Sequence, residues 1–468
     1  MDSLIAGLQA IVGARHCLIE PDTQAPFVAD WRGIYHGRAR AVVLPGTVAE
    51  VQAIVRLARQ HHAPIVPQGG NTGLSGGATP DDSGRAILLS LKRLTKVRTI
   101  DPLNNSMIAE AGCILANLQQ AANEADRLFP LSLSAEGTCQ IGGNLATNAG
   151  GINVLRYGNA RDLCLGLEIV LPDGTLLSNL HGLRKDNTGY DLKQIFIGSE
   201  GTLGIITAAA LKLFPKPVAR ATSVVALSDL DVAPALLARC RAGLADQLVS
   251  FELLPRFGIE LGQRFMPGLA WPLERLADWS ILIEANTSSA AFDIRAAMEQ
   301  CLADALDAGE IIDAAVASSE AQSLVLWQLR EGIVEGQNRT GASIKHDVSV
   351  PVAQVPAFVK AGFEAVLAAW PEARLLAFGH LGDGNIHFNL TQPEGESKAQ
   401  FLARTEGMNR IVHDLVARFA GSISAEHGIG QLRRAELQHR KPAAELDLMR
   451  RIKRMLDPDD LMNPGKLV

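Results

Sequence analysis

The first half of the chain alternates short apolar runs with segments whose apolar residues repeat at helical spacing. This alternation predicts strands and amphipathic helices. The strands are expected at 41–44, 64–67, 86–91 and 106–111, and the helices at 47–61 and 115–125. The sequence TVAE at 47–50 is a capping box, which is typical of a helix N-terminus. From 165 to about 215 the pattern is mainly that of strands, ending with a strand at 204–214.

Two prolines, Pro215 and Pro217, interrupt this pattern and indicate a domain boundary. Beyond them a strand–helix–strand unit occurs twice. The expected elements are 222–227, 232–241 and 248–253, then 280–285, 291–306 and 310–314. A doubled unit of this kind predicts an antiparallel sheet with helices on one face. Further helices are expected at 352–369 and 398–420, on either side of the segment 379–390.

The composition is that of a globular enzyme and excludes several other classes of protein. The 468 residues are enough for two or three domains. A net charge of −6 shows no basic stripe for nucleic acid or for an anionic membrane surface. No uncharged apolar run reaches the length of a membrane span, about 18 residues. The N-terminus lacks the basic region of a signal peptide, so a cytoplasmic location is expected.

The cysteines are scattered and form no Cys-x-x-Cys pair. They are Cys17, Cys113, Cys139, Cys164, Cys240 and Cys301. This spacing argues against a disulfide framework, a thiolate zinc site and an iron–sulfur cluster, and it fits a reducing compartment.

Glycine-rich segments occur at 67–73, 137–151 and 198–204, all in the first half of the chain. Glycine lets main-chain N–H groups converge on an anion such as a pyrophosphate. Any one segment is equally compatible with an ordinary turn. Three in one domain, each with Asn, Ser or Thr beside glycine, favour a cofactor that carries phosphate. None spells G-x-G-x-x-G between a strand and a helix, so the sequence gives no support for a nicotinamide site.

Two histidines, His380 and His387, flank a Gly-Asp-Gly turn in the second half of the chain. As neutral imidazoles they are able to bind one metal ion, although an isolated pair of histidines more often has a structural role, here capping the turn. The segment 424–430, SAEHGIG, adds Glu426 and His427. Two histidines and a glutamate make a three-ligand set with open positions. His427 is then left as a candidate general base.

Arg330 and Lys345 are candidate ligands of a substrate carboxylate, because Arg offers a bidentate fork and Lys a point charge. Most residues of either type are simply solvated on the surface, and that alternative stays open for both.

Motifs along nearly the whole chain, from about 41 to 466, resemble those of one known family. They are PQGGNTGL, EGTCQIGGNLATNAGG, NTGYDL, GSEGTLGIIT, REGI, GHLGDGNIH, AEHGIG and LDPDDLMNPGK, in this order. The chain resembles the FAD-linked 2-hydroxy-acid dehydrogenases of the vanillyl-alcohol-oxidase superfamily, which have a PCMH-type FAD-binding domain. Within it the resemblance is strongest to D-2-hydroxyglutarate dehydrogenases. D-lactate dehydrogenases and glycolate-oxidase flavoprotein subunits are its neighbours.

This resemblance implies an FAD site in the first domain, with the pyrophosphate on the first glycine segment. The implied contacts are Pro67, Gly69, Gly70, Asn71, Thr72, Gly73, Ser134, Gly137, Thr138, Gly142, Asn144, Gly201, Ile205 and Asn463. Superfamily members with a covalent flavin often carry a histidine where this chain has Asn71, so non-covalent FAD is expected.

The resemblance also implies His380, His387 and Glu426 as ligands of zinc or another divalent metal, and His427 as the base. Asn389 is expected near the substrate, with Arg330 and Lys345 on its carboxylate. Those enzymes have a threonine four residues after the arginine, where this chain has Val334. The loss of that hydroxyl leaves the exact substrate open.

The expected fold is α+β. A two-subdomain PCMH-type FAD-binding domain would span 1–216, with its core at about 38–216. A ferredoxin-like antiparallel-sheet substrate domain would follow at 217–420. A C-terminal helical segment at 421–468 would return to the FAD-binding domain.

The expected activity is the FAD-dependent, metal-assisted oxidation of a D-2-hydroxy acid, D-2-hydroxyglutarate first, to the 2-oxo acid. Electrons would pass to an acceptor other than a nicotinamide, such as an electron-transfer flavoprotein or a quinone. The alternatives are a D-lactate or D-malate dehydrogenase, an oxidase that reduces oxygen, and a flavoprotein subunit of a glycolate-oxidase-like complex. The resemblance also implies a homodimer, and no nucleic-acid partner or membrane span is expected.

Overall fold

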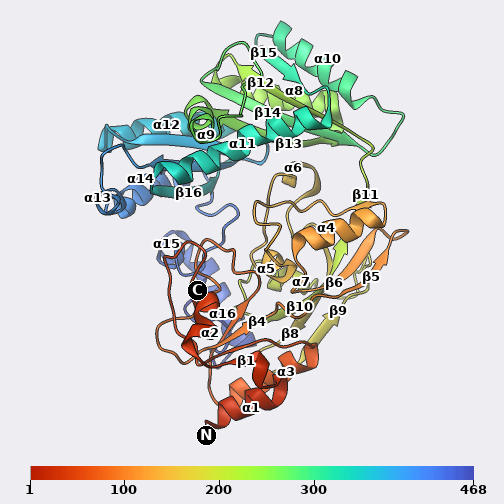
Figure 1. The fold of residues 1–468 in the computed structure, drawn as a ribbon, viewed down its shortest axis with the longest axis vertical. Coiled ribbons are helices and arrows are strands. Elements are labelled where there is room, and N and C mark those ends of the chain that lie inside the picture. The colour runs from red at the N-terminus through yellow and green to blue at the C-terminus, as the bar shows by residue number, and fades with distance from the viewer. Residues whose placement is uncertain (1) are drawn as a thin grey trace. The chain divides into compact units, whose positions relative to one another are not determined.

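The computed structural model describes residues 2–468, which form two compact units (Figure 1). Within the described residues, unit 1 comprises 2–151, Gly158–Lys216 and Glu426–Val468. Unit 2 comprises Ile152–Tyr157 and Pro217–Ala425. The chain therefore passes from one unit to the other near Pro217, where the two prolines interrupt the sequence pattern. The boundary near residue 425 carries no comparable signal in the sequence.

Unit 1 contains a small sheet with the strand order β1-β2-β4-β3. Its strands are β1 Cys17–Leu18, β2 Ala41–Val43, β3 Ile65–Gln68 and β4 Ile87–Ser90. Strands β2, β4 and β3 run parallel, whereas β1 is antiparallel to β2. The helices beside it are α1 Ser3–Val12, α2 Pro21–Val28 and α3 Val48–Gln60. Helix α3 begins at the predicted capping box, where Thr47 Oγ1 accepts the N–H of Glu50.

A second, antiparallel sheet of unit 1 has the order β5-β6-β10-β8-β9. Its strands are β5 Val97–Asp101, β6 Ser106–Glu110, β8 Cys164–Val170, β9 Leu176–Asn179 and β10 Ile205–Lys212. Strand β5 was not predicted, because its residues alternate between exposed and half-buried. A two-stranded pairing joins β7 Arg127–Leu128 and β11 Phe214–Pro215. The remaining helices of this unit are α4 Leu115–Glu124, α5 Ile141–Ala146, α7 Lys193–Phe196, α15 Arg434–Arg440 and α16 Ala443–Leu456.

Unit 2 is built on a seven-stranded sheet with the order β15-β12-β14-β13-β17-β18-β16, in which every pairing is antiparallel. The strands are β12 Ala219–Leu227, β13 Leu248–Pro255, β14 Trp279–Thr287, β15 Ile311–Val316, β16 Ser343–Ser349, β17 Arg374–His380 and β18 Asn385–Thr391. The first four have the ferredoxin-like order, which confirms the expected α+β architecture.

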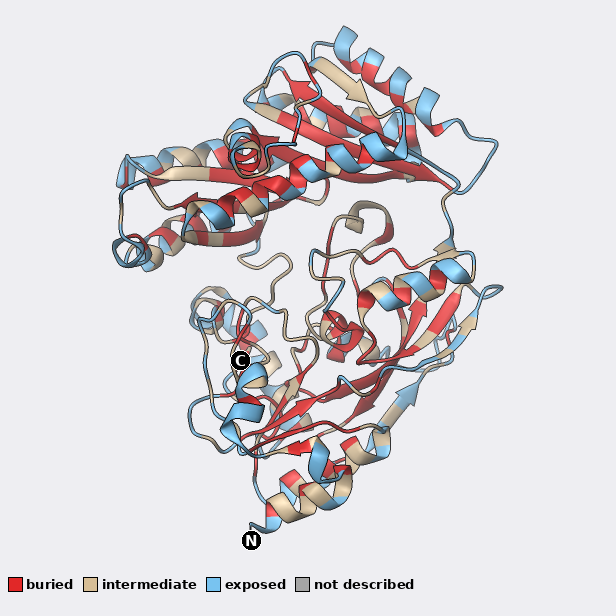
Figure 2. Ribbon diagram, viewed as in Figure 1, coloured by how far each residue is buried: buried red, intermediate tan, exposed pale blue. Residues whose placement is uncertain are grey.

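Helices cover both faces of this sheet, so the expectation of helices on one face is wrong. Val225 points to the face of α8 Ala233–Leu244, α10 Ile294–Asp307, α12 Val355–Ala369 and α14 Thr405–Arg418. Its neighbour Val224 packs with α9 Arg256–Phe265 and α11 Glu320–Thr340 on the opposite face. Both faces are apolar, and the buried strands in Figure 2 follow from this. The short helices α6 Val154–Tyr157 and α13 Lys398–Leu402 complete the unit.

The predicted helix at 398–420 is divided into α13 and α14. Within residues 2–468 one helical segment, Val352–Ala369, is long and apolar enough to cross a membrane by length and composition alone. Its residues Phe358, Val359 and Val366 belong to the core of unit 2, which is the packing of a core helix.

Candidate active site

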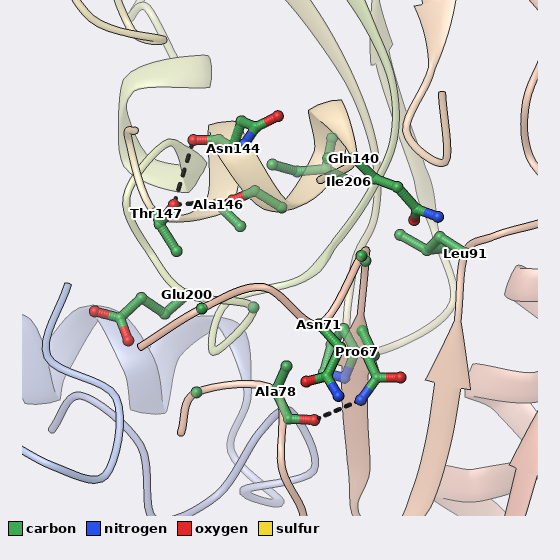
Figure 3. A pocket seen from close by; sticks show the side chains of 18 of the residues that line it. Pro67, Asn71, Ala78, Leu91, Gln140, Asn144, Ala146, Thr147, Glu200 and Ile206 are labelled. Atoms are coloured by element: carbon green, nitrogen blue, oxygen red, sulfur yellow. Dashed lines mark hydrogen bonds between the residues drawn. The ribbon is translucent and has the colours of Figure 1, made fainter. Parts of the chain in front are cut away.

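A cavity of about 960 Å³, including space open to solvent, lies within unit 1. Residues from all three glycine-rich segments line it, together with His427 from the C-terminal part of the unit. Figure 3 shows Asn71, Asn144, Glu200 and Ile206 around this space. The fold therefore brings together the first and third glycine segments, which are more than a hundred residues apart in the sequence.

The first glycine segment follows β3 and forms one wall of the cavity. Its Asn71 has a positive φ of 55° and donates from Nδ2 to the main-chain oxygen of Ala29 at 2.8 Å. A Cβ on Gly70 would lie 2.3 Å from the main-chain oxygen of Thr138. Glycine is therefore required at 70, because the second glycine segment passes directly against it.

The second segment presents polar groups that have no partner within the described residues. Gln140 Oε1 and Asn144 Oδ1 are both buried, line the cavity and accept no hydrogen bond from residues 2–468. Leaving such atoms unsatisfied is costly, so they indicate a ligand that donates hydrogen bonds. A Cβ on Gly73 or Gly143 would meet no described atom within 4 Å, so glycine keeps this space open.

The structure places ten of the predicted cofactor contacts on the cavity wall. They are Pro67, Gly69, Gly70, Asn71, Thr72, Gly73, Gly142, Asn144, Gly201 and Ile205. Ser134, Gly137, Thr138 and Asn463 do not line it. Asn463 instead links two residues of the wall. Its Nδ2 donates to the main-chain oxygens of Gly77 and Glu200 at 2.9 and 2.8 Å.

Several wall residues were not predicted from the sequence. The side chains of Gln140, Thr147 and Glu200 are prominent among them (Figure 3). All three lie within or beside glycine-rich motifs. Their position next to glycine is the only feature of the sequence that could have indicated a place on the cavity wall. Residues such as Leu91 carry no signal at all, because an apolar side chain at a strand end is equally typical of a core.

His427 lies in a loop that is fixed to the cofactor-side loops of unit 1. The carboxylate of Glu200 accepts the main-chain N–H groups of Ile429 and Gly430, each at 2.7 Å. Ser75 Oγ donates to the main-chain oxygen of His427 at 3.0 Å. Burial raises the pKa of Glu200 above its ordinary value, against the lowering effect of the two N–H bonds. This carboxylate was not predicted as part of the site.

In unit 2, His380 and His387 lie close together, with ring centroids 5.5 Å apart. His380 ends β17 and His387 is on the adjacent β18, joined by the Gly-Asp-Gly turn. The Nδ1 atom of His380 is 2.7 Å from Oε1 of buried Glu252, and that of His387 is 3.8 Å from Oδ1 of buried Asp347. Both Nδ1 atoms thus face a carboxylate, which is the arrangement of histidines that bind metal through Nε2.

Glu426, the third predicted ligand, is the first residue of the C-terminal part of unit 1. Its Oε1 accepts the main-chain N–H of Gly151 at 2.7 Å. Its role as a ligand stays a prediction from the sequence.

Arg330 lies in the middle of the 21-residue helix α11. Its Nε donates to Oε2 of Glu252 at 2.8 Å, and its guanidinium lies 4.8 Å from the ring centroid of Phe378. Burial alone would raise the pKa of Glu252, but nearby His380 and Arg330 lower it to about 2. Val334 is one turn further along α11 and is 37% exposed. Arg330 is thus a buried, paired residue and not a solvated surface arginine.

Lys345 and Asn389 are directly opposite each other on β16 and β18. Lys345 Nζ donates to Asn338 Oδ1 at 3.1 Å. The amide of Asn389 is buried and bonded on both sides, to Gln337 Oε1 at 2.9 Å and to the N–H of His346 at 3.2 Å. Asn389 therefore has a structural role in the sheet beside any role at the substrate.

Comparison with known proteins agrees with this architecture. The family described as FAD linked oxidases, C-terminal domain, matches residues 216–467, and an FAD binding domain matches residues 39–178. A D-2-hydroxyglutarate dehydrogenase of Xanthomonas citri pv. viticola is 38% identical over 100% of this chain and 97% of its own length. The mitochondrial D-2-hydroxyglutarate dehydrogenase of Bos taurus is also 38% identical, over 99% of this chain and 83% of its own.

A solved structure, p-cresol methylhydroxylase with substrate bound, has a TM-score of 0.78 and 15% identity. The match covers 100% of this chain and 96% of the methylhydroxylase chain. At this identity the likeness shows the fold alone, and that fold is of the PCMH type. The resemblance inferred from the motifs and the expected fold are both confirmed.

The prediction of a cytoplasmic location is contradicted by the names of the relatives. The relative from Bos taurus is named as mitochondrial, as are those from Oryza sativa and Arabidopsis thaliana. The prediction was based on the residues at the N-terminus.

The matched families, together with full-length relatives well above 30% identity, show that the chain belongs to the FAD-linked oxidase family and is an FAD-linked oxidoreductase acting on a CH–OH donor.

Proposed function

We propose that the protein oxidises D-2-hydroxyglutarate to the corresponding 2-oxo acid, with FAD bound in the cavity of unit 1. The substrate assignment is supported by the names of the relatives that match the chain over its full length. The observation that carries the mechanism is the position of His427, a titratable side chain on the wall of the same cavity as the three glycine segments.

The cavity fits FAD in its chemistry. The unpartnered oxygens of Gln140 and Asn144 would accept hydrogen bonds from the cofactor. The segment Gly69–Gly73 would offer its main-chain N–H groups to the pyrophosphate, and Gly143 leaves room for the cofactor's approach. Superfamily members with a covalent flavin often carry a histidine at the position of Asn71, and an amide is not a nucleophile that could form such a bond. The proposal therefore includes non-covalent FAD.

His427 acts as the general base in this proposal. It takes the proton from the 2-hydroxyl of the substrate as the C2–H bond breaks and the C2–O bond becomes a carbonyl. FAD held in this cavity would supply a two-electron acceptor for the hydride from C2. The bonds of Glu200 and Ser75 to the loop hold the imidazole in place for this transfer.

His380 and His387 would hold a divalent metal, such as zinc, through their Nε2 atoms, with Glu426 as the predicted third ligand. Their fit is supported by the carboxylates that face both Nδ1 atoms. A bound divalent ion supplies Lewis acidity that lowers the pKa of a coordinated hydroxyl.

Arg330 and Lys345 would bind the substrate carboxylates, with Asn389 nearby. A dicarboxylic acid uses both cations, whereas D-lactate has only one carboxylate. Val334 favours the second candidate, a D-lactate or D-malate dehydrogenase, because its methyl groups offer no hydrogen bond to the distal carboxylate of a glutarate one helical turn from Arg330. D-lactate has no distal carboxylate, and that of D-malate is one methylene closer to C2.

The electron acceptor is proposed to be a carrier other than a nicotinamide, since none of the glycine segments has the nicotinamide-site spacing. An electron-transfer flavoprotein or a quinone would serve. Peroxide release during turnover would instead identify an oxidase.

Replacing His427 with Asn tests the base directly. Asparagine keeps a polar side chain of similar size but cannot take the proton, so flavin reduction by D-2-hydroxyglutarate should fall by about 10²–10⁴-fold while FAD stays bound. A matched control is His36→Asn, at an exposed histidine of unit 1 that is not on the cavity wall. An unchanged reduction rate in H427N would remove His427 from this role.

A further inference from the structure

A single buried carboxylate joins the two groups to which the proposed function gives separate roles. Glu252 on β13 is 1% exposed, and each of its oxygens accepts one hydrogen bond. Oε1 accepts from His380 at 2.7 Å and Oε2 from Arg330 at 2.8 Å. His380 and Arg330 are themselves only 7% and 8% exposed. This arrangement lies entirely within unit 2.

We propose that Glu252 is a positioning residue that fixes both the metal-binding face of His380 and the guanidinium of Arg330. The proposal rests on the proposed function, because it assumes that His380 binds a metal and Arg330 a substrate carboxylate. It adds a coupling between the two: one side chain sets the orientation of both.

The bond to His380 fixes which nitrogen of the ring carries the proton. An ionised carboxylate only accepts hydrogen bonds, so Nδ1 of His380 must be the donor. Nε2 is then the unprotonated nitrogen, whose lone pair is of the kind that binds a metal ion. A carboxylate partner also raises the basicity of the imidazole and prevents rotation of the ring.

The bond to Arg330 uses only its Nε atom. Within residues 2–468 the two terminal nitrogens of this guanidinium make no hydrogen bond with protein atoms. Stacking over the ring of Phe378 and the bond to Glu252 together restrict the plane of the group. The terminal nitrogens, which form the pair suited to a carboxylate, are thus left for a ligand.

A matched control exists on the neighbouring strand. Glu284 on β14 is 5% exposed and pairs across the sheet with Ser250, two residues from Glu252, so both glutamates lie on the same face. Glu284 also reaches α11, where it accepts from Trp327 Nε1 at 2.6 Å. Among the described residues its hydrogen-bond and ion-pair partners are Thr222, Trp327 and Arg220, and not His380 or Arg330. Glu252→Gln and Glu284→Gln therefore remove the same charge from the same face of the same sheet.

The test is the affinity of the FAD-loaded protein for zinc, measured by competition with a chelator. Glutamine at 252 can accept from only one partner and places an N–H₂ against the other. We expect zinc to bind 10–100-fold more weakly to E252Q, and to bind E284Q as it does the wild type. Equal zinc affinity of E252Q and the wild type would overturn the proposal. Absence of zinc binding by the wild type would instead overturn the proposed metal site.

Steady-state kinetics with zinc in saturating amounts test the second half of the proposal. With the metal restored, E252Q should still show a KM for D-2-hydroxyglutarate raised at least tenfold, because Arg330 has lost its tether. E284Q should keep the wild-type KM. A wild-type KM in E252Q would show that Glu252 does not position Arg330.

A measurement on the wild type tests the proposal even if E252Q does not fold. In the zinc-loaded wild type labelled with ¹⁵N-histidine, His380 should carry its proton on Nδ1, protected from exchange by burial. A metal on Nδ1 and a proton on Nε2 would contradict the proposal whatever the variants do.

Discussion

The carboxylate of Glu200 accepts a hydrogen bond of 2.7 Å from the main-chain N–H of Gly430, although the two residues are 230 positions apart in the chain. A second bond of the same length comes from Ile429. Through these bonds the third glycine segment holds the loop that carries His427. A loop anchored on a buried carboxylate can keep a general base in a fixed position beside the cofactor cavity.

Replacing Glu200 with Gln should slow flavin reduction at least tenfold, because a neutral amide oxygen cannot hold both N–H groups as well and the loop loosens. The free energy of unfolding should fall by about 1–3 kcal/mol, as expected for weakened bonds of a buried charged group. Stopped-flow spectroscopy and urea unfolding measure the two effects. The matched control is Glu50→Gln, since Glu50 also accepts a main-chain N–H, from Gly46 at 2.7 Å, away from the cavity. A Glu200 variant that lost stability but reduced its flavin at the normal rate would refute the positioning argument.

Adjacent glycines of α5 should respond to alanine in opposite ways. In Gly143→Ala the new methyl group meets no described atom, so the apoprotein should gain about 0.5–1 kcal/mol from helix propensity while FAD binds more weakly. In Gly142→Ala the methyl would lie 2.6 Å from Cβ of Ala111, so the apoprotein should lose about 1–3 kcal/mol. Urea unfolding of the apoproteins and FAD titration separate these effects. Unchanged FAD affinity in G143A would argue against a cofactor beside residue 143.

Val334→Thr should improve the use of a dicarboxylic substrate. The hydroxyl adds a hydrogen-bond donor one helical turn from Arg330, so the KM for D-2-hydroxyglutarate should fall severalfold while that for D-lactate stays constant. Because Val334 is 37% exposed, the free energy of unfolding should change by less than about 0.5 kcal/mol. Leu324→Thr, at an exposed position earlier on the same helix, is the control. Equal changes for both substrates would show that residue 334 does not contact the distal carboxylate.

Lys466 should make the stability depend on pH in the alkaline range. It is 3% exposed, and burial lowers its pKa to about 8 from the model-compound value of 10.5. Between these two values the unfolded chain binds more protons than the folded one, so the free energy of unfolding rises with pH across this window. The two pKa values differ by about 2.5 units. The rise from this residue should therefore be on the order of 3 kcal/mol, at about 1.4 kcal/mol per pKa unit.

Lys466→Met should remove this part of the rise, and the difference between the two unfolding curves isolates it from other groups. Lys441→Met, at a lysine with a 42% exposed side chain, should leave the rise intact. Parallel curves for the wild type and K466M would show that Lys466 is charged in the folded protein throughout the range.

Much of the fold follows from local patterns. The capping box at Thr47 places the start of α3, and the prolines around Lys216 place a unit boundary, because both act through the backbone of a few neighbouring residues. The sequence did not predict that α9 and α11 form a second helical layer on the other face of the sheet, because both faces are apolar. Val224 and Val225 are equally hydrophobic, so the sequence does not say which face is covered.

The site was predicted only where its chemistry is concentrated in short motifs. The glycine segments and the histidines stand out in this way. Glu252 does not, because it is one acidic residue within the apolar strand LVSFELLP, and its partner His380 is 128 positions away. Its role depends on the pairing of β13 with β17, which brings Glu252 opposite His380. The spacing of residues in the sequence does not predict which residue of β17 pairs with Glu252.

The most direct test of the proposed function is the visible flavin band of the purified, FAD-loaded protein after anaerobic addition of D-2-hydroxyglutarate. We expect rapid bleaching, which prior chelation of the metal abolishes and added zinc restores. Bleaching by D-lactate or D-malate but not by D-2-hydroxyglutarate would contradict the substrate assignment. Bleaching that is indifferent to chelation would contradict the role of the metal.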